Sequence, residues 1–270
     1  MNYLTANQNT DGGWGLSAND TSNTYITSIV LRTLAAYNSV FINQNFINNA
    51  SAFLLAHQNT DGGFGSSPSN VYNTSLSLLS LIESGQGSTQ TILSGISYLT
   101  SSQLPDGSWN DDPYSTALAL QALAEARPNL AVSSSGITFS NSMPQSGATT
   151  TISAAISNTG YDNASNVIVR FYLGDPASGG VQIGTDQIIP SLAPNSSTQV
   201  SVTASFTGTG SKTIFVVVDP DNLISETSKA DNRASTRVWI ATGPDLAVYS
   251  EDMKPSVTIK TLAPYKDCPV

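Results

Sequence analysis

Three copies of one short motif constrain the fold of this 270-residue chain more than any other feature. Each copy consists of a glutamine, an Asp-Gly pair that begins three residues later, and an aromatic residue two positions after the glycine. The glutamines are separated by 58 − 8 = 50 and by 103 − 58 = 45 residues. Intervals of this length are typical of stacked supersecondary units that share one core. The copies are QNTDGGW at 8–14, QNTDGGF at 58–64 and QLPDGSW at 103–109.

A helix is predicted after each copy of the motif. The following segment opens with Tyr-x-Thr-x-(Ile/Leu)-x-Leu, beginning at Tyr25, Tyr72 and Tyr114. Apolar residues then recur every three or four positions, as in NTYITSIVLRTLAAY, and this spacing is that of an amphipathic helix. Each unit is therefore expected to be a helix, the motif turn and a second helix.

The motif residues suit a structural turn. Aspartate accepts hydrogen bonds from free backbone N–H groups, and glycine takes a positive φ without steric cost. The aromatic ring can fix the loop onto the neighbouring repeat, where the glutamine amide can lie against an aromatic face. We interpret the loops as structural fasteners, and the alternative is a loop that contacts a ligand. The motif residues are Gln8, Asp11, Gly12, Trp14, Gln58, Asp61, Gly62, Phe64, Gln103, Asp106, Gly107 and Trp109.

The sequence pattern changes near residue 127, where short alternating runs replace the helical spacing. TTISAAIS, NVIVRFYL, TQVSVTASF and KTIFVVVD alternate apolar with small or polar residues, and Gly, Pro, Asn and Ser separate the runs. About seven such strands predict an antiparallel β-sandwich. The segment contains no cysteine, so packing alone is expected to hold it together.

A second copy of the sandwich opening suggests how the chain is divided. RPNLAV at 127–132 recurs as GPDLAV at 243–248. We expect helical repeats over 1–126, a sandwich over 127–242 and the truncated start of a second sandwich over 243–270. The chain also begins inside a repeat, so we interpret it as part of a longer modular protein.

The repeated motif resembles the QW-type repeat of the α/α-toroid superfamily, over residues 1–126. This superfamily includes squalene and hopene cyclases, protein prenyltransferase β subunits and thioester domains of the α-macroglobulin type. The resemblance implies a partial toroid of helix pairs. It does not imply one activity, because this fold carries several unrelated functions.

The catalytic signatures of these relatives are absent from the chain. A cyclase proton donor is an Asp-x-Asp-Asp-Thr run, whereas Asp111 and Asp112 lie in the turn and not directly before Thr116. We interpret them as solvated turn carboxylates or caps. The prenyltransferase zinc site needs Asp, Cys and His together, but Cys268 lies outside the repeats and His57 lies at a helix end. No Cys-Gly-Glu-Gln thioester sequence and no Asp-Asp-x-x-Asp run occurs, so we assign no catalytic residue.

The second segment resembles the CARDB family, a cell-adhesion-related module of bacteria and archaea with an immunoglobulin-like fold. The resemblance rests on PNLAV, ISNTG at 156–160, GTDQIIPSLAPNSSTQVSV and VDPDNLISETSKADNRAST. Together with the toroid repeats, it implies a multidomain chain: an all-α partial α/α-toroid followed by an all-β immunoglobulin-like sandwich.

An acidic loop lies between the last two predicted strands. VDPDNLISETSKADN concentrates carboxylate and amide oxygens, which are ligands that Ca²⁺ prefers. Asp219, Asp221 and Asp231 are therefore a candidate calcium site, although the loop lacks the EF-hand pattern. In the alternative, Asp and Asn form Asx turns, and the acids pair with Lys229 or Arg233.

Composition narrows the classes of partner and the location. The net charge is −9 and the pI about 4.3, which argues against a nucleic-acid partner. No apolar run reaches the length of about 18–20 residues that spans a membrane. Only 11% of residues are charged, and such Ser/Thr/Asn-rich surfaces are typical of secreted and cell-surface proteins. No signal peptide is recognised at the start of the sequence.

These observations favour a non-enzymatic, secreted or cell-surface modular protein. The helical repeats would be a binding scaffold for an unknown protein or glycan, and the sandwich an adhesion or spacer module, with no cofactor except the candidate Ca²⁺. The alternative is part of a terpene-cyclase-like toroid enzyme whose catalytic residues lie upstream. In a third hypothesis, a processed envelope protein uses the repeats to recognise a peptide or glycan.

Overall fold

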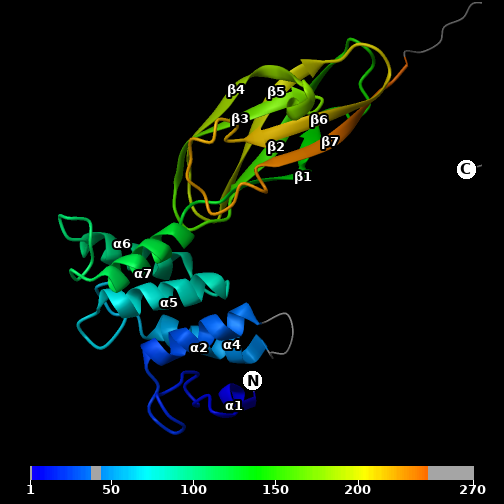
Figure 1. Ribbon diagram of the computed structural model, residues 1–270. Coiled ribbons are helices and arrows are strands. Elements are labelled where there is room, and N and C mark those ends of the chain that lie inside the picture. The colour runs from blue at the N-terminus through cyan, green and yellow to red at the C-terminus, as the bar shows by residue number, and fades with distance from the viewer. Residues whose placement is uncertain (1, 38–43, 243–270) are drawn as a thin grey trace, which may run out of the picture.

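The computed structural model describes residues 2–37 and 44–242, which form a helical part followed by a β-sandwich (Figure 1). The expected multidomain architecture, helical repeats and then a sandwich, is confirmed. The predicted start of a second sandwich at 243–270 lies outside the described residues.

The described helical part contains six helices, arranged as the repeat predicts. The first helix of each unit precedes the motif turn, and the second follows it. The second helices α2, α5 and α7 pack side by side, α2 against α5 and α5 against α7, while α4 and α6 cover them from outside. The helices are α1 (Asn2–Ala6), α2 (Thr24–Ala36), α4 (Gln44–Ala56), α5 (Val71–Glu83), α6 (Thr89–Ser101) and α7 (Pro113–Glu125).

Helix α5 lies at the centre of this array and is the most buried. Its small residues allow close approach, because the Ser77 Oγ lies 2.9 Å from the Ser28 Oγ of α2. Leu78, Leu79 and Leu81 are fully buried in the helical core. The burial of such leucines, roughly 1.5–3 kcal/mol each, supplies much of the driving force for stacking the repeats.

The helices α2, α5 and α7, here called the inner helices, each begin at an equivalent capped position. Asn23, Asn70 and Asp112 are the N-caps of α2, α5 and α7, and their side-chain oxygens accept hydrogen bonds of 2.8–3.1 Å from backbone N–H groups of the first turn. Such caps satisfy donors that a helix start leaves unpaired. Asp112 is therefore a cap, which is one of the two roles predicted for Asp111 and Asp112.

The sandwich consists of two antiparallel sheets with the orders β1-β2-β5 and β4-β3-β6-β7. The pairing of β2 with β5 runs unbroken from Thr149 opposite Ser205 to Asn158 opposite Ser196. Alternate side chains of both sheets fill the core between them. The strands are β1 (Leu130–Phe139), β2 (Thr149–Asn158), β3 (Ala164–Leu173), β4 (Val181–Leu192), β5 (Ser196–Ser205), β6 (Gly210–Val218) and β7 (Arg233–Ile240).

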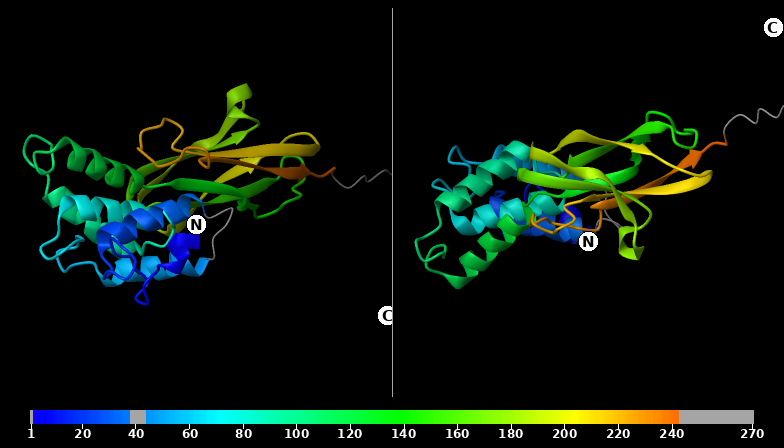
Figure 2. Two further views of the ribbon diagram at one scale, coloured as in Figure 1. Left: turned by 60° about the horizontal axis from the view of Figure 1, so that its bottom comes forward. Right: turned by 90° about the horizontal axis from the view of Figure 1, so that it is seen from above.

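A short linker joins α7 to β1, and the sandwich extends away from the helical part (Figure 1, Figure 2). Tyr161 of the β2–β3 loop packs against the helical core. Across the same junction, the Asn195 side-chain amide donates to the Thr89 Oγ1 at 2.6 Å. Gly160 leaves no room for a side chain, since an added Cβ would lie 2.3 Å from the Arg127 carbonyl oxygen. The β2–β3 and β4–β5 loops of the sandwich thus contact the helical part, and the β2–β3 loop also packs against the linker.

Candidate functional site

The motif aspartates form the same two bonds in every repeat. One carboxylate oxygen accepts a backbone N–H two residues on at 3.0 Å and a serine hydroxyl at 2.7 Å. The Ser69 hydroxyl holds the pKa of Asp61 below its usual range against the opposing effect of burial. The N–H and hydroxyl of Ser108 lower the pKa of Asp106 in the same way. The three motif carboxylates therefore serve to fold their own loops.

The motif aromatics are buried and held by hydrogen bonds. Trp14, Phe64 and Trp109 are at most 3% exposed. Each donates its backbone N–H, at 2.9–3.0 Å, to the threonine hydroxyl of the following Tyr-x-Thr sequence. The indole N–H groups of Trp14 and Trp109 donate to carbonyls of the preceding helix, Leu4 and Leu99, at 2.8 and 2.7 Å. The indole bonds thus join the two helices of one repeat.

The glutamines form the hydrogen bonds that cross to the next repeat. The Gln8 Nε2 donates to the Phe46 carbonyl of α4 at 3.0 Å, and the Gln58 Nε2 donates to the Thr91 carbonyl of α6 at 2.9 Å. Each also donates to a carbonyl within its own loop at 2.8 Å. Gln103 has only the loop bond in the described chain, to the Gly107 carbonyl at 2.9 Å. The amide therefore contacts carbonyl oxygens, where an aromatic face was expected.

The motif glycines show the same difference between the first two loops, which contact the next repeat, and the third loop. Gly12, Gly62 and Gly107 have φ of +91°, +86° and +87°. A Cβ at Gly12 would lie 2.4 Å from the Asn49 carbonyl oxygen, and one at Gly62 would lie 2.5 Å from that of Ser94, both on the next repeat. At Gly107 the nearest atom would be 3.9 Å away. The first two loops are thus packed against a following helix and the third is open.

Of the remaining polar candidates of the helical part, Asp112 and His57 have structural partners. Asp111 is in the left-handed region with φ 52°, and Asp112 caps α7. The N–H groups of Ser115 and Tyr114 and the Ser115 hydroxyl hold the pKa of Asp112 below its usual range. The His57 Nδ1 lies 2.7 Å from the Phe53 carbonyl oxygen, and its ring stacks on the Phe53 ring at 4.0 Å between centroids. These groups act at helix ends.

A row of tyrosines lies at the starts of the three inner helices. The rings of Tyr25 and Tyr72 are 5.4 Å apart, as are those of Tyr72 and Tyr114. Burial raises the pKa of Tyr72 well above its usual range, and hydrogen bonding with the other two hydroxyls adds to this effect. The Tyr-x-Thr repeat signalled this row in the sequence, although its alignment across helices requires the fold.

The tyrosine row continues into a groove between α2 and α5. Ile29 and Leu76 each lie four residues after a tyrosine of the row, and hence on the same helix face. Arg32 and Glu83 bridge the two helices with a bidentate ion pair of 2.8 and 3.0 Å. We call the row and the groove the inner face. The groove is lined by Ile29, Arg32, Thr33, Ala36, Tyr37, Leu76 and Glu83.

The three candidate calcium ligands in the acidic loop have different partners. Asp219 accepts from the N–H groups of Leu223 and Ile224. Asp221 pairs with both terminal nitrogens of Arg170 on β3, at 2.8 and 2.7 Å. Asp231 accepts from the Asn129 amide in the linker at 2.9 Å. These contacts direct the three carboxylates to three different parts of the sandwich.

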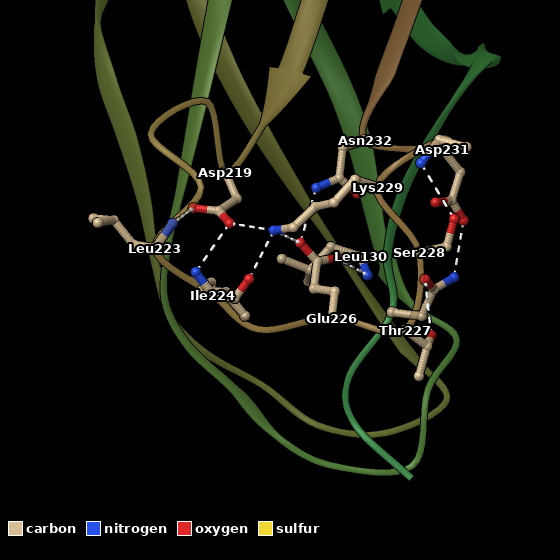
Figure 3. A network of polar contacts seen from close by, with 12 residues as sticks. Leu130, Asp219, Leu223, Ile224, Glu226, Thr227, Ser228, Lys229, Asp231 and Asn232 are labelled. Atoms are coloured by element: carbon tan, nitrogen blue, oxygen red, sulfur yellow. Dashed lines mark hydrogen bonds and ion pairs between the residues drawn. The ribbon is translucent and has the colours of Figure 1, made fainter. Parts of the chain in front are cut away.

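Lys229 lies at the centre of the loop (Figure 3). Its Nζ donates to the Asp219 Oδ2 at 2.6 Å, the Ile224 carbonyl at 2.7 Å and the Glu226 Oε1 at 2.5 Å. Burial by itself raises the pKa of Asp219, but Lys229 and the two backbone N–H groups outweigh it, so the pKa is lowered. Asp219 and Glu226 likewise raise the pKa of Lys229 against the effect of burial. The pair of Lys229 and Glu226, one of the ion pairs predicted from the sequence, is present. Asp219 is the second carboxylate partner of Lys229.

Two family models match the chain, one on each side of the linker. The squalene-hopene cyclase C-terminal domain matches residues 1–123, and CARDB matches residues 127–236. The chain joins a cyclase-like helical domain to a CARDB domain. No curated protein sequence matches it.

The solved structures similar to this chain include a CARDB domain. The CARDB domain of a Pyrococcus furiosus protein, in complex with di-metal ions, is 20% identical, covers 43% of this chain and 90% of its own, and has a TM-score of 0.36. A domain from Methanosarcina acetivorans is 23% identical, with coverages of 43% and 93% and a TM-score of 0.35. A Geobacter metallireducens domain is 34% identical, with coverages of 39% and 92% and a TM-score of 0.34.

The acidic loop of this CARDB domain does not have the geometry of a metal site. Over 2–37 and 44–242, no group of three or more His, Cys, Asp or Glu side chains is placed to hold a metal ion. The calcium site at Asp219, Asp221 and Asp231 stays a prediction that this arrangement does not fit. In the same ranges, no helix is both long and apolar enough to cross a membrane.

Proposed function

We propose that the chain is a non-enzymatic modular protein that acts outside the cell or at its surface. The cyclase-like domain would bind a protein or glycan ligand, and the CARDB domain would be an adhesion or spacer module. One contrast carries the proposal: the motif loops use their polar groups to hold the repeats together, whereas the inner face presents aromatic side chains to solvent. Tyr114 and Tyr37 are 58% and 57% exposed.

The chemistry of the inner face supports recognition rather than catalysis. Tyrosine combines a large apolar ring with a hydroxyl that both donates and accepts, and it is enriched where proteins contact ligands and partners. The charged side chains of the groove, Arg32 and Glu83, neutralise each other. Among the described residues that line this groove, none is an unpaired carboxylate, lysine, histidine or cysteine.

A second candidate function follows from the match of residues 1–123 to the cyclase C-terminal domain. In that case, the helical domain is part of a terpene-cyclase-like toroid whose catalytic residues lie upstream. The two hypotheses differ in what the inner face does. A scaffold retains its ligand unchanged, while a cyclase converts an isoprenoid into a cyclised product.

The test removes the two most exposed tyrosines of the inner face. The chain and the variant Tyr37→Ala/Tyr114→Ala are applied to a glycan array and a peptide array, and each ligand found is titrated. We expect the variant to bind at least about tenfold more weakly, equivalent to about 1.4 kcal/mol, with an unchanged Tm. Tyr3→Ala is the matched control, because Tyr3 is 67% exposed on α1, outside the inner face.

Two results would count against the scaffold. If every ligand binds the chain and the double variant equally, the inner face is not the binding surface. If the chain releases a cyclised product from squalene, the enzymatic hypothesis replaces the scaffold.

A further inference from the structure

We infer that the acidic loop, residues 219–232, clamps the interdomain linker onto the CARDB domain, with the ammonium group of Lys229 as its resident cation in place of a metal ion. Two sets of contacts meet in this loop. One set surrounds the ammonium with oxygen atoms, and the other holds the backbone between α7 and β1.

The first set gives the ammonium a complete shell of acceptors. A lysine ammonium has three N–H donors, and Lys229 has three oxygen partners at 2.5–2.7 Å. The side chains of Asp219 and Glu226 are 2% and 0% exposed, so solvent hardly screens their negative charges. The Lys229 side chain is 36% exposed, and removing its charge leaves the two buried carboxylates uncompensated, which destabilises the fold.

The same oxygen atoms explain why no metal ion is needed. Ca²⁺ binds six to eight oxygens at about 2.3–2.6 Å, commonly carboxylates and backbone carbonyls. The ammonium of Lys229 already contacts two carboxylates and one carbonyl of that kind. A divalent ion would have to displace the ammonium from those oxygens. The chain thus supplies its own counter-charge.

The second set extends the clamp to the linker. The other oxygen of Glu226 accepts the Leu130 backbone N–H at 2.6 Å. Thr227 donates its backbone N–H to the Pro128 carbonyl at 3.1 Å and its hydroxyl to the Asn129 side-chain oxygen at 3.2 Å. The loop therefore contacts three consecutive residues, Pro128 and Asn129 of the linker and Leu130 at the start of β1. Figure 3 shows Glu226 between Lys229 and Leu130.

Lys229 holds this arrangement through Glu226. Without the ammonium, Asp219 and Glu226 are two buried carboxylates that repel each other. Glu226 would then move toward solvent and release the Leu130 N–H. We therefore expect the charge of Lys229 to control exchange at an amide that Lys229 itself does not touch.

The experiment uses the full chain and the variant Lys229→Met, which keeps a long unbranched side chain, one atom shorter, and removes the charge. Thermal unfolding is followed in EDTA, in millimolar CaCl₂ and in millimolar MgCl₂, and hydrogen exchange of the Leu130 amide is measured by NMR. Lys212→Met is the matched control, because Lys212 forms no ion pair with any residue of 2–37 or 44–242.

We expect the same Tm for the unaltered chain in all three solutions. Lys229→Met should lower the Tm in EDTA, regain part of the loss in CaCl₂ and speed Leu130 exchange at least about tenfold, while Lys212→Met changes neither quantity. A Ca²⁺-dependent Tm in the unaltered chain, or no Ca²⁺ rescue of Lys229→Met, would overturn the resident cation. Unchanged Leu130 exchange would overturn the clamp.

A further variant covers the case in which Lys229→Met does not fold. Lys229→Arg keeps a cation at the same position, so it should fold, show a Tm independent of Ca²⁺ and retain slow Leu130 exchange. If it is as unfolded as Lys229→Met, the charge is not what the loop requires, and the inference fails.

Discussion

Replacing Trp109 with alanine is expected to lower the free energy of unfolding of the helical domain by about 3–5 kcal/mol, the usual range for deleting a buried tryptophan. The ring is 1% exposed, and its indole N–H donates to the Leu99 carbonyl at 2.7 Å. The substitution creates a cavity and also removes one of two donors to that carbonyl, which keeps the Ser102 N–H at 3.1 Å. Chemical denaturation, followed by the helical signal in far-UV circular dichroism, measures the loss.

Two further variants show how much of the loss comes from the packing of the Trp109 ring. One tests the contribution of its hydrogen bond, and the other tests the effect of removing any tryptophan ring. Trp109→Phe keeps most of the ring and loses the N–H, so its loss should be clearly smaller than that of Trp109→Ala. Trp239→Ala removes a 54% exposed ring from the sandwich and should change stability by less than about 0.5 kcal/mol. A Trp109→Ala variant that keeps its stability but loses a ligand would instead make this loop a recognition element.

Gly62→Ala is expected to be the second most damaging change, and much worse than the equivalent Gly107→Ala. Both glycines have a positive φ, which costs an alanine roughly 1–2 kcal/mol. At Gly62 the new Cβ would also lie 2.5 Å from the Ser94 carbonyl oxygen, so α6 must shift. Overpacking of this kind adds about 1–3 kcal/mol. We therefore expect losses of about 2–5 kcal/mol for Gly62→Ala and about 1–2 kcal/mol for Gly107→Ala, measured by the same denaturation.

The pair of glycine variants has an internal control, since both glycines directly follow an aspartate and have nearly the same φ. If the two variants lose equal stability, contact with the following repeat contributes nothing at Gly62. The loop would then be a local turn whose only requirement is its backbone conformation.

The repeated architecture could be predicted because its signals are local. The spacing of apolar residues predicts each helix, and the Asp-Gly pair predicts a turn with a positive φ that glycine supplies. Strand alternation was equally local: Ile152, Ala154 and Ile156 point to the same side of β2, and all three are fully buried. The resemblance of both domains to known families reinforced these patterns.

The partners of the functional groups could not be predicted in the same way, because they come from distant parts of the chain. Asp221 pairs with Arg170, which lies 51 residues earlier, and Asp231 pairs with Asn129, which lies 102 residues earlier. A cluster of acids in the sequence suggests a shared cation. The folded strands instead turn each carboxylate toward a different partner.

The inner face shows the same limit. Nothing in the sequence places Tyr25, Tyr72 and Tyr114 in one row, because their alignment depends on how three helices pack. The periodic recurrence of the Tyr-x-Thr sequence was the available signal. It could have identified the row once equivalent positions of stacked repeats were assumed to be neighbours.

The central claim is that the motif loops fasten one repeat to the next. Substituting the motif glutamines tests this claim most directly. Gln58→Ala removes a loop hydrogen bond and the bond to the Thr91 carbonyl of the next repeat, whereas Gln103→Ala removes a loop bond alone. A typical hydrogen bond contributes about 0.5–1.5 kcal/mol, and Gln58→Ala loses one more such bond than Gln103→Ala. The free energy of unfolding of the helical domain should therefore fall by about 0.5–1.5 kcal/mol more in Gln58→Ala than in Gln103→Ala. Equal losses in the two variants, or a larger loss in Gln103→Ala, would contradict the fastener.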